Sequence, residues 1–220
     1  MYSERFEEAI RRYWIVRKEK TVRGGKQLDA LAELVAQIFI DEGFPETSIQ
    51  RGTSLELPGY YRPEKKWDLL VVYEGTLAAA IEFKSQVGSF GKNFNNRAEE
   101  AVGSATDIWT AYREGRFGNV RPWLGYLFLL EDAPEASRPV RAKEPFFEID
   151  EAFKGASYKK RYEVFCRRLV RERLYDAACF VTSSEDPRSP IEEPAGDLSF
   201  AKFAAEIKGR AKALLEIKKA

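Results

Sequence analysis

An alternation of apolar and polar residues predicts a β-hairpin in the first half of the chain. Two apolar runs of strand length, 67–73 and 77–84, flank the break at 74–76. Val71 and Ile81 are β-branched residues that favour strands, and a short break containing glycine favours a hairpin loop. We therefore expect two neighbouring antiparallel strands in this part of the chain.

The register of this hairpin would gather three charged residues on one face. If the loop has three residues, Tyr73 faces Leu77 and Asp68 lies opposite Glu82. Lys84 shares that face, because side chains two residues apart on a strand point to the same side. The rest of the face is small and apolar, with Leu70, Val72, Ala78 and Ala80. The other face is expected to hold Trp67, Leu69, Val71, Tyr73, Ile81 and Phe83.

This pair of carboxylates has the chemistry of a metal site. Asp68 and Glu82 would repel each other at an apolar position unless a cation joined them. Mg²⁺ takes oxygen ligands of this kind, and Lys84 would lie where it can hold a water or a phosphate oxygen. The alternative is a simple ion pair at a sheet edge, because Glu-x-Lys is a weak motif that occurs four times in the chain. Only Glu82 ends an apolar strand beside a second acid.

Helical periodicity and continuous apolar runs predict the remaining elements. The run 123–130 is apolar throughout, which is typical of a central strand covered on both faces. Its position after a helical segment favours parallel pairing with the hairpin. Helices are predicted over 1–20, 28–42, 98–113 and 158–174, with a last one capped by Asp197 or Ser199. Further strands are predicted over 53–57 and 177–182.

Two predicted loops carry residues suited to nucleic acid. The stretch 85–97 is rich in glycine, amides and basic residues directly after Lys84. The stretch 131–157 is long and polar, and only Phe146, Phe147, Ile149 and Phe153 could anchor it. The helix 158–174 is strongly basic, which makes it a candidate surface for phosphate contacts, although a charged helix face is usually just solvated.

Composition limits the chemistry available. The 220 residues carry a formal net charge of +1, so phosphate binding must come from local clusters of charge. The chain has no histidine, which excludes histidine bases and His/Cys zinc sites. With two cysteines, no apolar signal segment and no stretch long enough for a membrane span, we expect a reduced cytoplasmic protein. We expect a single domain over 1–220.

The predicted element order is that of an α/β protein with a mixed central sheet flanked by helices. The order αβββαβ, with an acid on the second strand and Glu-x-Lys on the third, resembles the core of the PD-(D/E)XK nuclease superfamily. The chain departs from that pattern because Trp67 stands where a proline often precedes Asp68. The resemblance implies a restriction-endonuclease-like core over about 28–185, with a helical extension over about 197–220.

Several longer segments resemble the XhoI-type restriction endonuclease family. They are Lys66-Trp67-Asp68-Leu69-Leu70, the run from Ile81 to Ser89, the run from Gly91 to Glu100, Gly103-Ser104-Ala105-Thr106-Asp107, and Arg121-Pro122-Trp123-Leu124-Gly125-Tyr126. The matched stretches lie within about 50–185. The family implies a Type II enzyme, a homodimer that cuts both strands of double-stranded DNA at a palindromic site, CTCGAG in known members. A separate methyltransferase would protect host DNA.

The resemblance also implies roles for single residues. Asp68 and Glu82 would hold Mg²⁺ together with the backbone carbonyl of Phe83, and Lys84 would orient or activate the attacking water. Gln86 on the same face and Glu33 on the first core helix are supporting candidates. The candidate DNA contacts are Lys92, Asn93, Asn95, Asn96, Arg97, Arg138, Arg141, Lys159 and Lys160.

Three other functions are compatible with the residues. A repair or recombination nuclease of the same fold would recognise DNA structure instead of sequence. A DNA-binding module with a degenerate site would bind without cutting, which the intact set of Asp68, Glu82 and Lys84 disfavours. An α/β protein unrelated to nucleic acid would also fit the near-neutral charge.

Overall fold

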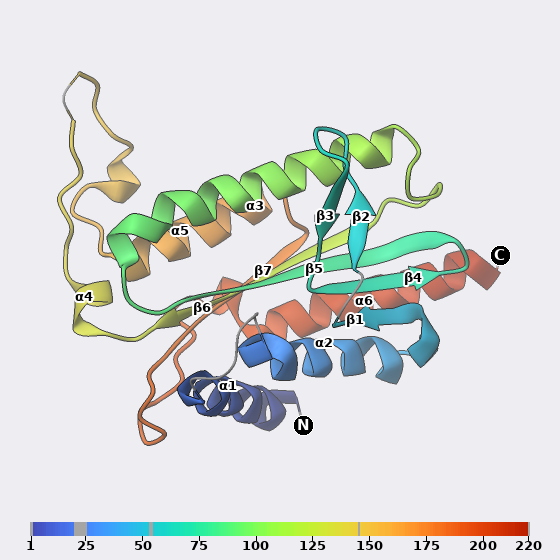
Figure 1. The fold of residues 1–220 in the computed structure, drawn as a ribbon, viewed down its shortest axis with the longest axis horizontal. Helices are drawn as coiled ribbons and strands as arrows, with labels where there is room; N and C mark the ends of the chain where they lie inside the picture. The colour runs from blue at the N-terminus through green and yellow to red at the C-terminus, as the bar shows by residue number, and fades with distance from the viewer. Residues whose placement is uncertain (1, 20–25, 53–54, 145, 220) are drawn as a thin grey trace.

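The computed structural model describes residues 2–19, 26–52, 55–144 and 146–219. A five-stranded mixed sheet in the order β1-β4-β5-β6-β7 forms its centre (Figure 1). The strands are β1 Ile49–Arg51, β4 Leu69–Tyr73, β5 Thr76–Gln86, β6 Trp123–Glu131 and β7 Ala177–Ser183. Antiparallel pairing joins β1, β4 and β5, whereas β5, β6 and β7 run parallel. The predicted α/β class with a mixed sheet is therefore confirmed.

Helices cover both faces of the sheet (Figure 1). The helices are α1 Tyr2–Lys18, α2 Asp29–Asp41, α3 Phe90–Arg113, α4 Pro134–Ser137, α5 Tyr158–Arg171 and α6 Phe200–Lys219. Single 3₁₀ turns lie at Lys26–Leu28, Glu46–Ser48, Glu151–Phe153 and Gly196–Leu198. One buried cluster joins α1, α2 and α6 to the sheet, through side chains such as Ile10, Val35, Phe203 and Ile81. A second joins α3 and α5 to the other face.

The hairpin of β4 and β5 turns more tightly than the sequence predicted. Its loop has two residues, Glu74 and Gly75, with φ of 47° and 70°, and Tyr73 pairs with Thr76. Positive φ at both central positions is the geometry of a type I′ turn, whose twist matches that of the flanking strands. The predicted pairing of Tyr73 with Leu77 is therefore wrong at the tip of the hairpin.

The pairing next to the charged residues is nevertheless as predicted. A bulge between Val71 and Val72 absorbs one residue, so that Leu69 pairs with Ile81. Asp68, which precedes β4, therefore comes beside Glu82. The predicted faces also hold for Leu69, Val71, Ile81 and Phe83 on one side and for Leu70 and Ala80 on the other. Two residues pack in the cluster opposite to the one predicted: Trp67, which lies outside β4, and Ala78, which is the extra residue at the bulge.

The strand predicted over 53–57 does not pair with the hairpin. The edge partner of β4 is β1, where Ile49 is buried against Val71. Residues 56–58 instead form β2 Glu56–Pro58, which pairs with β3 Glu64–Lys66 in a separate two-stranded sheet. Residues 53–54 lie outside the described part of the chain. The predicted strand thus overlaps β2, whereas the charged strand β3 has no apolar alternation and was not predicted.

The predicted loop 85–97 is largely helical. Helix α3 begins at Phe90, where the preceding Gly88 and Ser89 both have positive φ. Phe94 stacks edge-on against Tyr162 with ring centroids 5.1 Å apart, and Phe90 is buried. These aromatic contacts with α5 extend the apolar face of α3 into a segment whose amides and glycines are typical of a loop.

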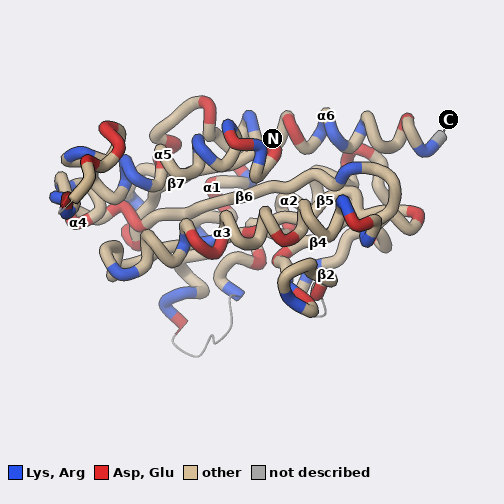
Figure 2. Tube along the Cα trace, turned by 90° about the horizontal axis from the view of Figure 1, so that it is seen from above, with Lys and Arg blue, Asp and Glu red and all other residues tan. Residues whose placement is uncertain are grey.

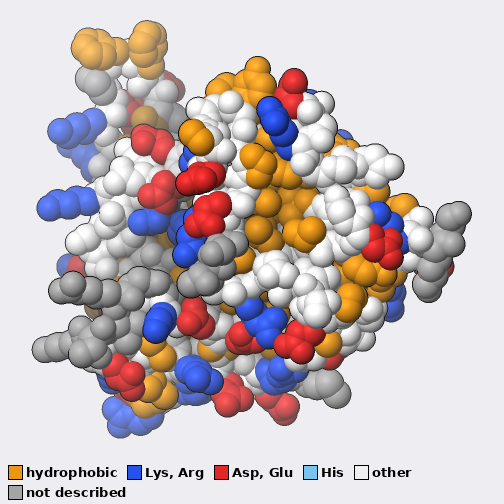
Figure 3. Space-filling view, turned by 45° about the vertical axis from the view of Figure 1, so that its right-hand side comes forward, with side chains coloured by type: hydrophobic (Ala, Val, Ile, Leu, Met, Phe, Trp, Pro, Cys, Tyr) orange, Lys and Arg blue, Asp and Glu red, His pale blue; other side chains and the backbone are white. Residues whose placement is uncertain are grey.

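The segment between β6 and α5 projects from the body of the molecule at the left of Figure 1. Of its four predicted anchors, Phe153 contacts Phe94 with ring centroids 6.4 Å apart. Phe146 and Phe147 are 87% and 88% exposed, so they anchor nothing within the described chain. Figure 3 shows hydrophobic side chains at the end of this projecting segment. Arg161 of α5 fixes the base of the projecting segment by donating to the backbone carbonyl of Val140.

The last helix is capped by one of the two predicted residues. The Ser199 hydroxyl accepts from the backbone N–H of Lys202 at 3.3 Å, whereas Asp197 pairs with Arg167. The helix packs on α2 and β7 and buries Phe203 and other apolar side chains. In the described part of the chain, no helix is long and apolar enough to cross a membrane.

One glycine in the sheet is required by its neighbours. A Cβ on Gly125 in β6 would lie 2.6 Å from Cζ3 of Trp123 and 2.9 Å from Cζ of Phe203. We expect Gly125→Ala to lower the free energy of unfolding by about 1–3 kcal/mol, as overpacked cores do. Denaturant unfolding measures this.

The matched control is Gly103→Ala in α3, where no described atom lies within 4 Å of the added Cβ. That variant should be up to about 1 kcal/mol more stable, because alanine is the better helix former. Equal effects of the two substitutions would contradict this packing of β6.

Candidate functional site

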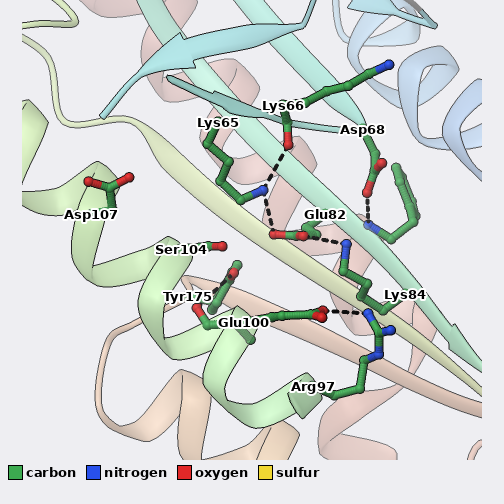
Figure 4. Close-up of polar contacts among 12 residues, drawn as sticks. Lys65, Lys66, Asp68, Glu82, Lys84, Arg97, Glu100, Ser104, Asp107 and Tyr175 are labelled. Atoms are coloured by element: carbon green, nitrogen blue, oxygen red, sulfur yellow. Dashed lines mark hydrogen bonds and ion pairs between the residues drawn. The ribbon is translucent and has the colours of Figure 1, made fainter. Parts of the chain in front are cut away.

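Glu82 lies in the middle of the sheet with a cation on each side. Strand β5 pairs with both β4 and β6, and Glu82 is only 4% exposed. Lys84 Nζ lies 2.5 Å from Glu82 Oε1, and Lys65 Nζ lies 3.1 Å from Glu82 Oε2. Figure 4 shows the two lysines pointing toward Glu82 from opposite directions. A buried carboxylate is thus held by two ammonium groups.

Asp68 lies beside Glu82 at the point where β4 begins. Its Oδ2 accepts from the backbone N–H of Phe83 at 2.8 Å, and its own N–H donates to Ile81 at 3.3 Å. These two bonds continue the ladder between the strands and fix the Asp68 carboxylate against β5. The two acids predicted to share a face are therefore brought together, with Lys84 next to them.

The two carboxylates have opposite pKa shifts. Burial raises the pKa of Asp68 above its usual value, because nearby Lys84 and the bond from Phe83 offset the burial only in part. Burial acts on Glu82 in the same direction, but Lys84 and Lys65 outweigh it, so the pKa of Glu82 lies below its usual value. Glu82 is therefore held as the anion.

Lys65 is the residue of this site that the sequence did not reveal. It lies on β3, in the short hairpin outside the main sheet, and its ammonium is 4.0 Å from the centre of the Trp67 ring. Burial lowers the pKa of Lys65 despite the neighbouring Glu82. The charged stretch 64–66 has the composition of an exposed turn, so its sequence does not indicate a buried lysine. The one feature that links Lys65 to the site is that it lies three residues before Asp68.

Asp107 of α3 anchors the β2–β3 hairpin. Its carboxylate accepts from the backbone N–H of Tyr60 at 2.7 Å and of Tyr61 at 2.8 Å, and from Nε of Arg62 at 2.7 Å. The three donors outweigh the burial of Asp107 and lower its pKa. The hairpin that carries Lys65 is therefore tied to the helix on the far side of the site.

The two predicted supporting residues lie apart from the carboxylate pair. Gln86 is buried, and its Nε2 donates to the backbone carbonyl of Gly88, so it holds the chain after β5. Glu33 on α2 pairs with Nε of Arg51 at 2.7 Å. Glu33, Arg51 and Asp68 nevertheless line one pocket of about 350 Å³.

The donor set fits a hard divalent cation. Among the described residues there is no group of three His, Cys, Asp or Glu side chains close enough to hold a metal ion. Mg²⁺ does not need one, because it keeps several waters and binds through one or two carboxylates. Glu82 Oε2 is buried, and the cation nearest to it is the Lys65 ammonium, 3.1 Å away. Asp68, Glu82 and the Phe83 carbonyl could hold such an ion.

The predicted DNA contacts on α3 differ in their freedom to bind. Lys92, Asn95 and Asn96 are exposed, and their side chains form no hydrogen bond or ion pair with the described residues. Asn93 Nδ2 donates to the carbonyl of Ser89 at 3.0 Å. Arg97 pairs with Glu100 at 2.5 Å. Arg138 and Arg141, on the projecting segment, are exposed.

Most basic residues of α5 already have acidic partners within the chain. The closest pairs are Lys159 with Glu192 at 2.6 Å, Lys160 with Glu163 at 2.7 Å, Arg167 with Asp197 at 2.7 Å and Arg168 with Asp150 at 2.8 Å. Figure 2 shows Lys and Arg interspersed with Asp and Glu along the helices. Helix α5 therefore offers less free positive charge than its composition indicates.

The chain is similar to known restriction enzymes. A family described as restriction endonuclease XhoI matches residues 16–192. The chain is 48% identical over 191 residues to the Type II restriction enzyme BstVI of Geobacillus stearothermophilus, covering 83% of this chain and 85% of that protein. It is 49% identical over 153 residues to the Type II restriction enzyme XhoI of Xanthomonas vasicola, covering 68% and 62% of the two chains.

A third relative is the Type II restriction enzyme AbrI of Azospirillum brasilense, 53% identical over 125 residues and covering 56% of each chain. No solved structure matches the chain. The family match spans most of the chain and includes every residue of the carboxylate and lysine cluster. The protein therefore belongs to the XhoI family of Type II restriction endonucleases, which are hydrolases.

Proposed function

We propose that this protein cuts both strands of DNA at a short palindromic sequence, with Mg²⁺ bound at Asp68 and Glu82. The observation that supports the proposal most directly is the buried Glu82 carboxylate beside Asp68, with Lys84 Nζ 2.5 Å away. The site sequence CTCGAG follows from the family resemblance. Within the cell, we expect a cytoplasmic enzyme that acts together with a separate DNA methyltransferase.

Each residue of the cluster has a role in phosphodiester hydrolysis. Bound Mg²⁺ supplies a Lewis acid and a water of lowered pKa. Asp68, Glu82 and the Phe83 carbonyl would hold the cation, and the hydrogen bond from the Phe83 N–H keeps the Asp68 carboxylate in place. Lys84 orients the attacking water toward the phosphorus on the side opposite the leaving oxygen. The sheet fixes all four groups on adjacent strands, so little reorganisation is needed on reaction.

A homodimer would supply two such sites. A palindromic sequence presents the same bases on each strand, and a two-fold dimer places one cluster at each strand. We propose residues 1–220 as one nuclease domain, with its catalytic core over about 28–185 and the helical segment from about 197 to 220 added to it. The free thiols Cys166 and Cys179 are both buried, as suits a reducing compartment.

We expect the purified protein to cut a sequenced plasmid into discrete fragments with Mg²⁺ and to leave it intact with EDTA. Mapping the fragment ends identifies the recognition site, and CTCGAG is the expected result. Discrete fragments that end elsewhere would retain the proposed function and reject that sequence. A smear, or cutting only at branched DNA, would favour a repair nuclease instead, and DNA binding without cutting would favour a degenerate module.

We expect Lys84→Ala to lower the cleavage rate at saturating Mg²⁺ by at least about 100-fold, as the loss of one transition-state contact does. Folding should survive, because Glu82 keeps Lys65 as its counter-ion and the Lys84 side chain is already 23% exposed. Single-turnover cleavage and thermal unfolding measure the two effects. The control is Lys202→Met, which removes an exposed lysine from α6 on the other face of the sheet. Cleavage at the wild-type rate by Lys84→Ala would reject the assignment.

We expect Lys92→Ala to weaken DNA binding equally for cognate and unrelated duplexes. An exposed lysine at the start of α3 is suited to a phosphate, so the slope of log affinity against log salt should fall by about 1. Fluorescence anisotropy in Ca²⁺, at several salt concentrations, measures this. A loss confined to the cognate duplex would instead make Lys92 a base reader, and an unchanged affinity would remove the start of α3 from the DNA interface.

A further inference from the structure

The β2–β3 hairpin lies over β5, the strand that carries Glu82 and Lys84, but it belongs to a separate sheet (Figure 1). From this hairpin Lys65 reaches down to Glu82, and its side chain is only 12% exposed. Lys66, the next residue, points away from Glu82 (Figure 4). Lys65 is therefore a cation delivered to the site from outside the sheet.

The hairpin holds Lys65 in this position by several contacts. The Lys65 ammonium donates to the backbone carbonyl of Lys66 at 3.0 Å and lies over the Trp67 ring. The tip of the hairpin is fixed to α3 through Asp107. Gly59 allows this close approach, because a Cβ there would lie 2.6 Å from Asp107 Oδ2 and 2.7 Å from the carbonyl oxygen of Arg62. A largely buried lysine with these contacts is not a solvated surface group.

The position of Lys65 conflicts with a metal ion at the same carboxylate. Glu82 Oε1 is taken by Lys84, and Lys65 lies against Oε2. A divalent cation shared with Asp68 needs an oxygen of Glu82, and Oε2 has the longer of the two lysine contacts. Two cations cannot both lie against this oxygen without strong repulsion. Binding of the metal therefore requires Lys65 to withdraw.

We propose that Lys65 is a positioning residue that occupies Glu82 Oε2 in the metal-free protein and competes with the divalent cation for it. It balances the charge of Glu82 while the site is empty, and it lowers the affinity of the free protein for metal. The inference rests on the proposed function only in taking Glu82 as a metal ligand. It assigns a role to the β2–β3 hairpin, which the relation to the family does not provide.

The test is calorimetric titration of Mn²⁺ into the DNA-free protein. We expect Lys65→Met to bind Mn²⁺ about tenfold more tightly than the wild type, because a like charge is removed from the site. Lys65→Arg, which keeps the charge, and Lys202→Met, which removes a lysine elsewhere, should bind like the wild type. Unchanged or weaker binding by Lys65→Met would overturn the proposal.

Thermal unfolding gives a second readout, independent of DNA cleavage. Lys65→Met should unfold at a lower temperature than the wild type without metal, because Glu82 loses a counter-ion. Saturating Mn²⁺ should then raise its unfolding temperature by more than that of the wild type, as tighter binding requires. If Lys65→Met does not fold, Lys65→Gln is titrated instead, since its amide can still donate to the Lys66 carbonyl. A smaller rise for the variant would contradict competition.

A Glu82→Gln variant separates this inference from the proposed function. If the wild type binds Mn²⁺ and Glu82→Gln does not, Glu82 is a ligand. The affinity of Lys65→Met for Mn²⁺ then tests the role of Lys65 independently of the proposed function. If wild type and Glu82→Gln bind Mn²⁺ equally, the metal lies elsewhere and both proposals fail. If Mn²⁺ binds to Lys65→Met but not to the wild type, Lys65 prevents metal binding in the DNA-free protein, and competition is supported.

Discussion

The burial of the Glu82 carboxylate between two lysines is the interaction on which the rest of the site depends. An anion this deep in a sheet is costly unless it is paired and hydrogen-bonded. Lys84 comes from the same strand as Glu82, and Lys65 comes from a separate hairpin. The hairpin in turn needs its anchor at Asp107. The carboxylate therefore links three parts of the chain, namely the central sheet, the β2–β3 hairpin and helix α3.

The same arrangement explains how a nearly neutral protein can act on a polyanion. The 36 Lys and Arg are almost balanced by 35 Asp and Glu, so the charge of the whole chain does not identify the partner. The positive charge at the site is local: two ammonium groups lie within 3.1 Å of one buried carboxylate.

The sequence predicted the β4–β5 hairpin and the pairing of Asp68 with Glu82 because both follow from local alternation. The loop length was predicted wrongly, but the bulge at Val71 and Val72 restored the register before it reached Asp68. The long apolar run of β6 predicted its central place, and its position after a helical segment predicted its parallel pairing. Local patterns of polarity thus determined the centre of the fold and the two carboxylates.

The remaining features depend on contacts between distant parts of the chain. The position of Lys65 depends on Asp107, which is far from it in sequence and is bonded to the tip of the hairpin. The start of α3 at Phe90 depends on aromatic side chains of α5. The edge strand β1 is recognisable only from its pairing with β4. No alternation or propensity within these segments indicates such partners, so sequence alone assigned them to loops.

The central claim is that Asp68 and Glu82 together hold a divalent cation. Crystals of the protein with a cognate DNA duplex, grown in Mn²⁺ with cleavage blocked by Lys84→Ala, would locate the metal directly by anomalous scattering. The account predicts a peak between the two carboxylates, in contact with the Phe83 carbonyl. A strong peak at another place, with none between Asp68 and Glu82, would contradict it.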